Sequence, residues 1–256
     1  MPMSRLAKDF HPFTWYMSRH TRGGLTVPRA IVGKRSLAAG VYQDLKQDVL
    51  HCELRPGQEV YEGQLAERYG VSKTPIREAL NTLRQEGYVQ VVPRRGYLIS
   101  PVSVQDVQHI FHVRLLLEPS AAELAAQHVT GEELAELRRL AQRRAGQSRT
   151  ERMTTNRAFH LAVAHASRNP RLVAFIGKLL EEVQRVYHLG LDLKLDDVAH
   201  HDHHQALVDA LMTGDHHLAR DIMAEAVQAS RKQVMEALVT TETAGYSLLV
   251  VGGSAR

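Results

Sequence analysis

The stretch Gln64–Ser100, which reads QLAERYGVSKTPIREALNTLRQEGYVQVVPRRGYLIS, decides the fold of the first half of the chain. A short helix is predicted over 62–69, which includes the start of this stretch, and Gly70 ends it. The next segment predicts a longer helix over 74–86, in which Pro75 suits the first turn and Gly87 ends the helix. Two helices joined by a short turn predict a helix–turn–helix.

Two short strand-like runs follow the second of these helices. YVQVV (88–92) and GYLIS (96–100) are joined by PRRG, which predicts a β-hairpin with Gly96 in its turn. A further helix is expected over 37–54, because apolar residues recur there at helical spacing. A helix–turn–helix followed by a two-stranded hairpin predicts a winged helix.

The longer helix of the quoted stretch carries basic and apolar side chains on opposite faces. Lys73, Arg77 and Arg84 share one face, and Thr74 and Asn81 lie near it. The opposite face carries the apolar residues Ile76, Leu80 and Leu83. Arginine can read guanine through two hydrogen bonds, while lysine and threonine suit phosphates or base edges. The pattern favours a helix that enters the DNA major groove; the alternative is a basic amphipathic helix that serves packing alone.

Arg94 and Arg95 add basic charge at the tip of the predicted hairpin, where they would reach the adjacent minor groove or the DNA backbone. The net charge of the whole chain is only +4, so this basic surface is local. A local basic surface suggests a polyanion that touches one face of the protein.

The second half of the chain is predicted to be helical from Ser103 to about Val239. The expected helices cover 103–128, 131–148, 150–167, 170–190, 197–213 and 215–239. Capping residues mark several starts, namely Ser103 with Asp106, Thr130 with Glu133, Asn169 before Pro170, and Asp215. Each helix has an apolar stripe, so an all-helical bundle is the economical packing.

The expected organisation is therefore mainly α, with two folded domains. We predict a basic arm over 1–35, a winged helix–turn–helix domain over 36–101, a helical effector-binding and dimerisation domain over 102–239, and a tail over 240–256.

Several protein classes are not favoured by the composition. The single cysteine, Cys52, rules out a disulfide within the chain and suits a reducing compartment. The N-terminal residues lack the apolar core of a secretory signal, and the apolar run SLLVV (247–251) is too short to span a bilayer. We expect a cytoplasmic protein with no membrane partner.

The quoted stretch is very similar to the DNA-binding region of GntR-superfamily transcription regulators. The second half resembles the effector domain of their FadR/FCD branch, in its shorter, VanR-type form with six helices. The segments that carry this second resemblance are SVQDVQHIFHVRLLLEPSAAELAAQ (103–127), NRAFHLAVAHASRNPRL (156–172) and HHQALVDALMTGDHHLARDIM (203–223).

The resemblance implies a homodimer on a pseudo-palindromic DNA operator, with a small metabolite or metal that alters DNA affinity. The family's DNA contacts correspond to Lys73, Thr74, Arg77 and the wing residue Gly96. One position departs from the pattern, because the family usually carries arginine where this chain has Gly63. We expect the basic arm to compensate for the missing contact.

The chain contains 15 histidines, four of them in the run HHDHH (200–204). Asn156 and His160 share a face of their predicted helix, and His204 lies on the apolar stripe of its own, so all three are expected to face the bundle interior. Relatives of the FCD branch often hold a divalent metal with an Asp or Asn and three histidines. The resemblance maps the first three ligands onto Asn156, His160 and His204, and the fourth onto Ala226, which cannot bind a metal. Either these residues bind Zn²⁺ or Ni²⁺, or they are polar groups that line an effector pocket.

Arg114 and Glu118 lie four residues apart on the first bundle helix. Their spacing favours a structural ion pair. The alternative is that Arg114 lines the effector pocket and receives a carboxylate effector.

Together these features predict a metabolite-responsive transcription regulator, most simply a repressor, and not an enzyme. Two alternatives remain. One is a constitutive dimeric DNA-binding regulator with a degenerate effector site. The other is a metal-dependent hydrolase, although the chain lacks an H-E-x-x-H helix, a nucleophile motif and a glycine-rich phosphate loop.

Overall fold

The computed structural model describes residues 37–142, 146–189 and 197–243, and the side chains of all of these except 197–201 and 239–243. The arm predicted over 1–35 and residues 244–256 of the predicted tail lie outside the described residues. So do the side chains of His200 and His201.

Residues 37–100 form the winged-helix head that the sequence predicts. Its elements are α1 (Leu37–Leu50), β1 (Glu59–Val60), α2 (Glu62–Tyr69), α3 (Lys73–Gln85), β2 (Val89–Val92) and β3 (Gly96–Ile99). The sheet order is β1-β3-β2, with both pairs antiparallel. The first strand was not predicted, because two residues are too few to give a recognisable alternation. Helix α1 ends four residues earlier than predicted.

The core of the head is built from the apolar face of each helix and from the inner face of the sheet. Leu45 of α1, Ile76 and Leu80 of α3, and Ile99 of β3 are completely buried. These side chains hold α3 by its apolar face. The opposite face of α3 is therefore left to solvent.

The wing closes over β1 at a position that only glycine can occupy. Gly96 has a φ of +87°, and a Cβ atom added there would lie 2.8 Å from the carbonyl oxygen of Val60. Real Cβ atoms do not approach a backbone oxygen so closely, so any side chain at this position would push β3 away from β1.

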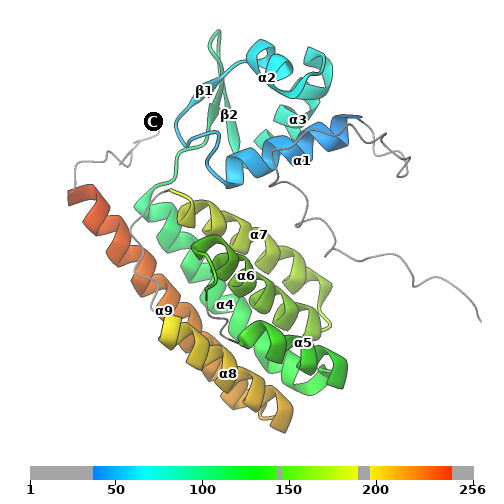
Figure 1. The fold of residues 1–256 in the computed structure, drawn as a ribbon, viewed down its shortest axis with the longest axis vertical. Helices are drawn as coiled ribbons and strands as arrows, with labels where there is room; N and C mark the ends of the chain where they lie inside the picture. The colour runs from blue at the N-terminus through cyan, green and yellow to red at the C-terminus, as the bar shows by residue number, and fades with distance from the viewer. Residues whose placement is uncertain (1–36, 143–145, 190–196, 244–256) are drawn as a thin grey trace, which may run out of the picture. The chain divides into compact units, whose positions relative to one another are not determined.

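The remaining described residues form a helical bundle. Its helices are α4 (Val104–His128), α5 (Gly131–Ala141), α6 (Arg149–Ala166), α7 (Pro170–Tyr187), α8 (Asp197–Thr213) and α9 (His216–Thr243). Helix α4 lies in the middle, with α7 on one side and α9 on the other (Figure 1). The six described helices agree with the number that the sequence predicts.

The predicted caps are confirmed. Ser103 and Asp106 form a complete capping box at α4, and Thr130 and Glu133 form another at α5. The side chain of Asn169 accepts hydrogen bonds from the backbone of the first turn of α7. The side chain of Asp215 likewise accepts a hydrogen bond from the backbone N–H of Leu218 at the start of α9.

The end of the second bundle helix was also predicted wrongly. The helix expected over 131–148 ends at Ala141, and α6 begins at Arg149. Gly146 has a φ of +79°, which a right-handed helix does not contain. Ser148 and Glu151 form a third capping box, whose S-x-x-E spacing is visible in the sequence and marks the true start of α6.

Within the ranges that the structure describes, none of the helices combines the length and the apolar character needed to cross a membrane.

Candidate functional site

The predicted recognition surface is exposed as the sequence suggests. Lys73, Thr74, Arg77 and Asn81 are all exposed along α3, while Ile76 on the opposite face is completely buried. The charges therefore project away from the core of the head. Contact of these side chains with DNA stays a prediction.

Arg77 is held by a residue that the sequence analysis did not single out. Its Nε and Nη2 donate hydrogen bonds of 2.9 and 2.7 Å to the two carboxylate oxygens of Glu62, in the first turn of α2. The hydroxyl of Tyr97 on the wing strand β3 donates a third, at 3.1 Å. The Arg77 hydrogen bonds, helped by that of Tyr97, hold the pKa of Glu62 below its usual range. Glu62 thus links α2, α3 and the wing at the edge of the basic surface.

The three wing residues predicted to contact DNA differ in their surroundings. Arg94 is exposed at the tip, with a φ of +64°. Arg95 forms an ion pair of 3.2 Å with Glu59 of β1, although its side chain remains 68% exposed. Gly96 was predicted as a DNA contact. In the structure it allows the wing to pack closely against Val60 of β1.

The departure at Gly63 has a local consequence. A Cβ atom on Gly63 would lie 3.8 Å from Cε of Lys73, so the lysine side chain passes beside this position. Lys73 therefore lies next to the place where the resemblance implies an arginine. The compensating role expected of residues 1–35 lies outside the described residues.

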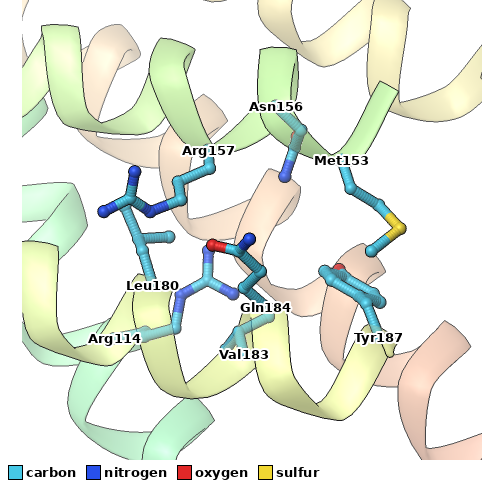
Figure 2. Close-up of a pocket in the computed structure, with 8 residues that line it drawn as sticks. All are labelled: Arg114, Met153, Asn156, Arg157, Leu180, Val183, Gln184 and Tyr187. Carbon is cyan, nitrogen blue, oxygen red and sulfur yellow. The ribbon is translucent and has the colours of Figure 1, made fainter. Parts of the chain in front are cut away.

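The bundle contains a narrow pocket between α4, α6 and α7 (Figure 2). About 270 Å³ of empty space lies between its side chains, open solvent included. The residues that line it are Arg114, Met153, Asn156, Arg157, Leu180, Val183, Gln184 and Tyr187. Two of the predicted effector residues, Arg114 and Asn156, are among them. His160 and His204 are not.

Arg114 belongs to a buried charged cluster behind this pocket. Its Nε lies 2.5 Å from Oε1 of Glu118, and the other oxygen of Glu118 lies 2.6 Å from Nδ1 of His160. Arg114 and Glu118 are each 1% exposed, and His160 is 3% exposed. Burial alone would raise the pKa of Glu118, but the charges and hydrogen bonds of its two partners outweigh it and lower the pKa to about 2. The predicted ion pair is confirmed.

His160 and His204 meet in the bundle core. Their rings lie edge to face with centroids 5.3 Å apart, and the His204 ring also stacks on Phe159 at 3.9 Å. Asn156 lies one turn before His160, and its Oδ1 is buried without a hydrogen-bond partner among the described residues. The three polar residues predicted to face inward do so, but the two histidines serve the core rather than the pocket wall.

These groups do not fit the four-ligand metal site that the resemblance implies. Glu118 engages one ring nitrogen of His160, and Ala226, buried at the fourth position, offers no ligand. Where the structure describes side chains, it brings no three His, Cys, Asp or Glu residues into an arrangement that would hold a metal ion. Two imidazoles and a neutral amide remain, which is a weak set for a divalent transition metal.

The wall of the pocket that α7 supplies was not predicted from the sequence. Leu180, Val183, Gln184 and Tyr187 recur at three- and four-residue spacing, a pattern that marks an inward face but says nothing about a cavity. Arg157 was also missed, although it directly follows Asn156 in the sequence. Its place in the pocket wall depends on the packing of α6 against α7.

Comparison with known proteins identifies both halves of the chain. Residues 37–99 match the model of "Bacterial regulatory proteins, gntR family", and residues 109–229 match the FCD domain. The regulator McbR of Escherichia coli strain K12 is 30% identical over 199 residues, which cover 75% of this chain and 90% of McbR. The solved structure of E. coli McbR/YncC aligns with a TM-score of 0.67 and 29% identity, covering 78% of this chain and 98% of that one.

A further relative is matched over a shorter part. The uncharacterized HTH-type transcriptional regulator YdhC of Bacillus subtilis strain 168 is 32% identical over 152 residues, 57% of this chain and 66% of YdhC. The chain thus spans just under two thirds of the length of this relative.

Proposed function

Because this chain belongs to the GntR family of DNA-binding transcription regulators and carries an FCD domain, we propose that it is an effector-responsive repressor that binds its operator as a homodimer. The observation that carries the proposal is the exposed basic face of α3, backed by a fully buried apolar face and flanked by the wing. A helix presented in this way suits the major groove.

In this proposal the head uses Arg77 and Lys73 at the centre of its surface and the wing tip at the edge. Glu62 fixes the Arg77 guanidinium through two hydrogen bonds. The side chain therefore loses less conformational entropy when it binds DNA. Selection of DNA fragments from a random library by the full-length protein would test this role. Enrichment of one pseudo-palindromic sequence supports it, and enrichment without any common sequence contradicts it.

The bundle is proposed to dimerise. Leu116 on α4 and Phe175 on α7 are 61% and 60% exposed, so each presents a large apolar side chain to solvent. A second copy would bury them. Sedimentation equilibrium should give a dimer mass for the wild-type protein and a monomer for a Leu116→Glu or Phe175→Glu variant. A monomeric wild-type protein at micromolar concentration would contradict the proposal.

The pocket is proposed to bind a small carboxylate effector. Arg114, Arg157, Asn156 and Gln184 offer polar groups, and the remaining lining residues are apolar or aromatic. Convergent polar groups in an apolar pocket are typical of a ligand site. A panel of small carboxylates in a thermal unfolding assay should contain at least one that raises the melting temperature by several degrees. No stabilisation across a broad panel would favour the alternative, a regulator with a degenerate effector site.

We assign the pocket a binding role rather than a catalytic one. The metal-dependent hydrolase considered from the sequence needs an open metal position beside a general base. His160 and His204 instead contact Glu118 and Phe159 in the core. A hydrolase screen with ester and phosphate substrates is expected to show no turnover above that of a His160→Gln variant.

A further inference from the structure

Helix α7 has contacts on two sides. Toward α4 and α6 it supplies one wall of the pocket. Toward the head it reaches α1 and the residue that follows it: Glu181 lies 2.9 Å from Nζ of Lys46, and the Gln184 side chain lies 3.2 Å from Nε2 of His51. The guanidinium of Arg185 donates a hydrogen bond to the carbonyl oxygen of Ser100. The same helix therefore touches the candidate effector site and the head.

Arg157, not Arg114, is the incompletely neutralised cation of the pocket. Both Nε and Nη2 of Arg114 face Glu118, at 2.5 and 3.4 Å, in a site that is almost fully buried. Arg157 is 34% exposed, its Nε is buried without a hydrogen-bond partner among the described residues, and its Nη2 lies 3.6 Å from Glu181. That separation is beyond hydrogen-bond distance. Figure 2 shows Arg157 reaching from α6 at the edge of the pocket, with Arg114 nearer the centre of the view.

Glu181 is shared between this arginine and the head. Its Oε1 faces Arg157, and its Oε2 faces Lys46. Lys46 also lies 3.0 Å from Glu86, the residue that caps the C-terminal end of α3. Burial would lower the pKa of Lys46, but hydrogen bonds to Glu181 and Glu86 outweigh it and raise the pKa. A row of alternating charges thus runs from the pocket to the end of the recognition helix: Arg157, Glu181, Lys46 and Glu86.

We propose that Arg157 receives an anionic group of the effector and that Glu181 and Lys46 transmit its arrival to α3. An anion that pairs with Arg157 draws the guanidinium away from Glu181. The carboxylate is then left wholly to Lys46, whose hold on Glu86 fixes the end of α3 against α7. This inference rests on the proposed function, since it describes how an effector would restrict the movement of the head. The row of charges itself does not depend on DNA binding.

The only cysteine of the chain provides a readout. Cys52 lies at the same contact between α7 and the head, with its Sγ 3.5 Å from the carbonyl oxygen of Arg185. Cys52 is partly buried, and burial raises the pKa of its thiol to about 11, so opening of the contact should speed its reaction with a neutral maleimide. The labelling rate therefore measures how often α7 and the head separate.

The variants are expected to change this rate in opposite directions. Lys46→Gln removes the cation that holds Glu181 to Glu86, and should speed labelling about two- to five-fold, the size expected of partly buried ion pairs. Arg157→Gln leaves Glu181 to Lys46 alone, and should slow labelling by a similar factor. Arg220→Gln is the matched control, because it removes an arginine whose 3.0 Å ion pair with Glu123 joins α9 to α4, and its rate should equal that of wild type. Equal unfolding temperatures would show that the variants are folded.

Inorganic phosphate serves as the anion probe, with sodium chloride at matched ionic strength as its control. Phosphate should slow labelling of the wild-type protein and leave the Arg157→Gln rate unchanged. A wild-type rate that phosphate does not alter, or an Arg157→Gln variant that labels as fast as wild type, overturns the proposal. These measurements contain no DNA, so they test the charge relay separately from the proposed function. If Lys46→Gln and Arg157→Gln change the labelling rate in opposite directions but the protein selects no operator, only the proposed function is wrong. If the protein selects an operator but both variants label at the same rate, only the relay is wrong.

Discussion

Glu62 at the start of α2 accepts two hydrogen bonds from the Arg77 guanidinium on the exposed face of α3, at 2.9 and 2.7 Å. The pair joins the two helices of the helix–turn–helix at their solvent-facing side, while apolar packing joins them beneath. It also fixes where the Arg77 guanidinium lies before any DNA is bound.

Arg77→Ala is expected to weaken binding to the selected operator by about 1–3 kcal/mol, roughly 5- to 150-fold, because a positioned arginine contact to a base edge is worth about that much. Binding to unrelated DNA should fall much less. Fluorescence anisotropy at fixed salt concentration measures both. Arg168→Ala is the control, since Arg168 forms a similar bidentate ion pair with Glu133 in the bundle. Equal losses on the two DNAs would mean that Arg77 contacts only phosphates.

Gly96→Ala should destabilise the protein more than Gly70→Ala. Both glycines have positive φ, at +87° and +66°, so both substitutions carry the conformational cost of roughly 1 kcal/mol. Only at Gly96 does the new Cβ atom meet a backbone oxygen, that of Val60, and the clash should add about 1–3 kcal/mol. Urea unfolding of both variants gives the difference, and equal losses would refute the steric role of Gly96.

Glu118→Gln tests the buried charged cluster. At neutral pH the substitution leaves Arg114 buried without its counter-charge, and should cost about 3–5 kcal/mol. The pKa of Glu118 is lowered in the folded protein from 4.5 to about 2, so its contribution is complete above about pH 4.5 and is lost as the pH falls toward 2. The difference in unfolding free energy between wild type and variant should therefore shrink on acidification. A difference that stays constant from pH 7 to pH 3 would contradict this assignment.

Zn²⁺ and Ni²⁺ are expected to stabilise the wild-type protein little, because position 226 supplies no ligand. Ala226→His should create a site whose Zn²⁺ stabilisation exceeds that of wild type by about 2 kcal/mol or more at saturating metal. Thermal unfolding with and without metal, compared within each variant, removes any effect of the substitution on the apo protein. Strong stabilisation of the wild-type protein by either metal would show that residues outside the described set complete the site.

The sequence predicted the features that depend on neighbours in the chain. The caps at Ser103, Thr130 and Asn169 and the Arg114–Glu118 pair are local, and all are confirmed. The strand β1 and the end of α5 were missed or misplaced, because a two-residue strand has no period and the capping box at Ser148 was overlooked.

The pocket and the head contacts depend on packing between distant segments. Arg157 and Glu181 lie 24 positions apart in the numbering, and neither spacing nor composition brings them together. The stacking of His204 on Phe159 likewise arises only when α6 and α8 pack. Such juxtapositions are properties of the folded bundle, so the sequence offered the candidate residues without their partners.

The most direct test of operator recognition by α3 is a footprint of the full-length protein on the DNA sequence that it selects from a random library. Two protected half-sites related by two-fold symmetry are expected, with centres about one helical turn or a small multiple apart, because two recognition helices would lie in successive major grooves. Protection should disappear when Lys73 and Arg77 are both replaced by alanine. Uniform protection along the fragment, or a footprint that the double variant retains, would contradict the claim that α3 reads an operator.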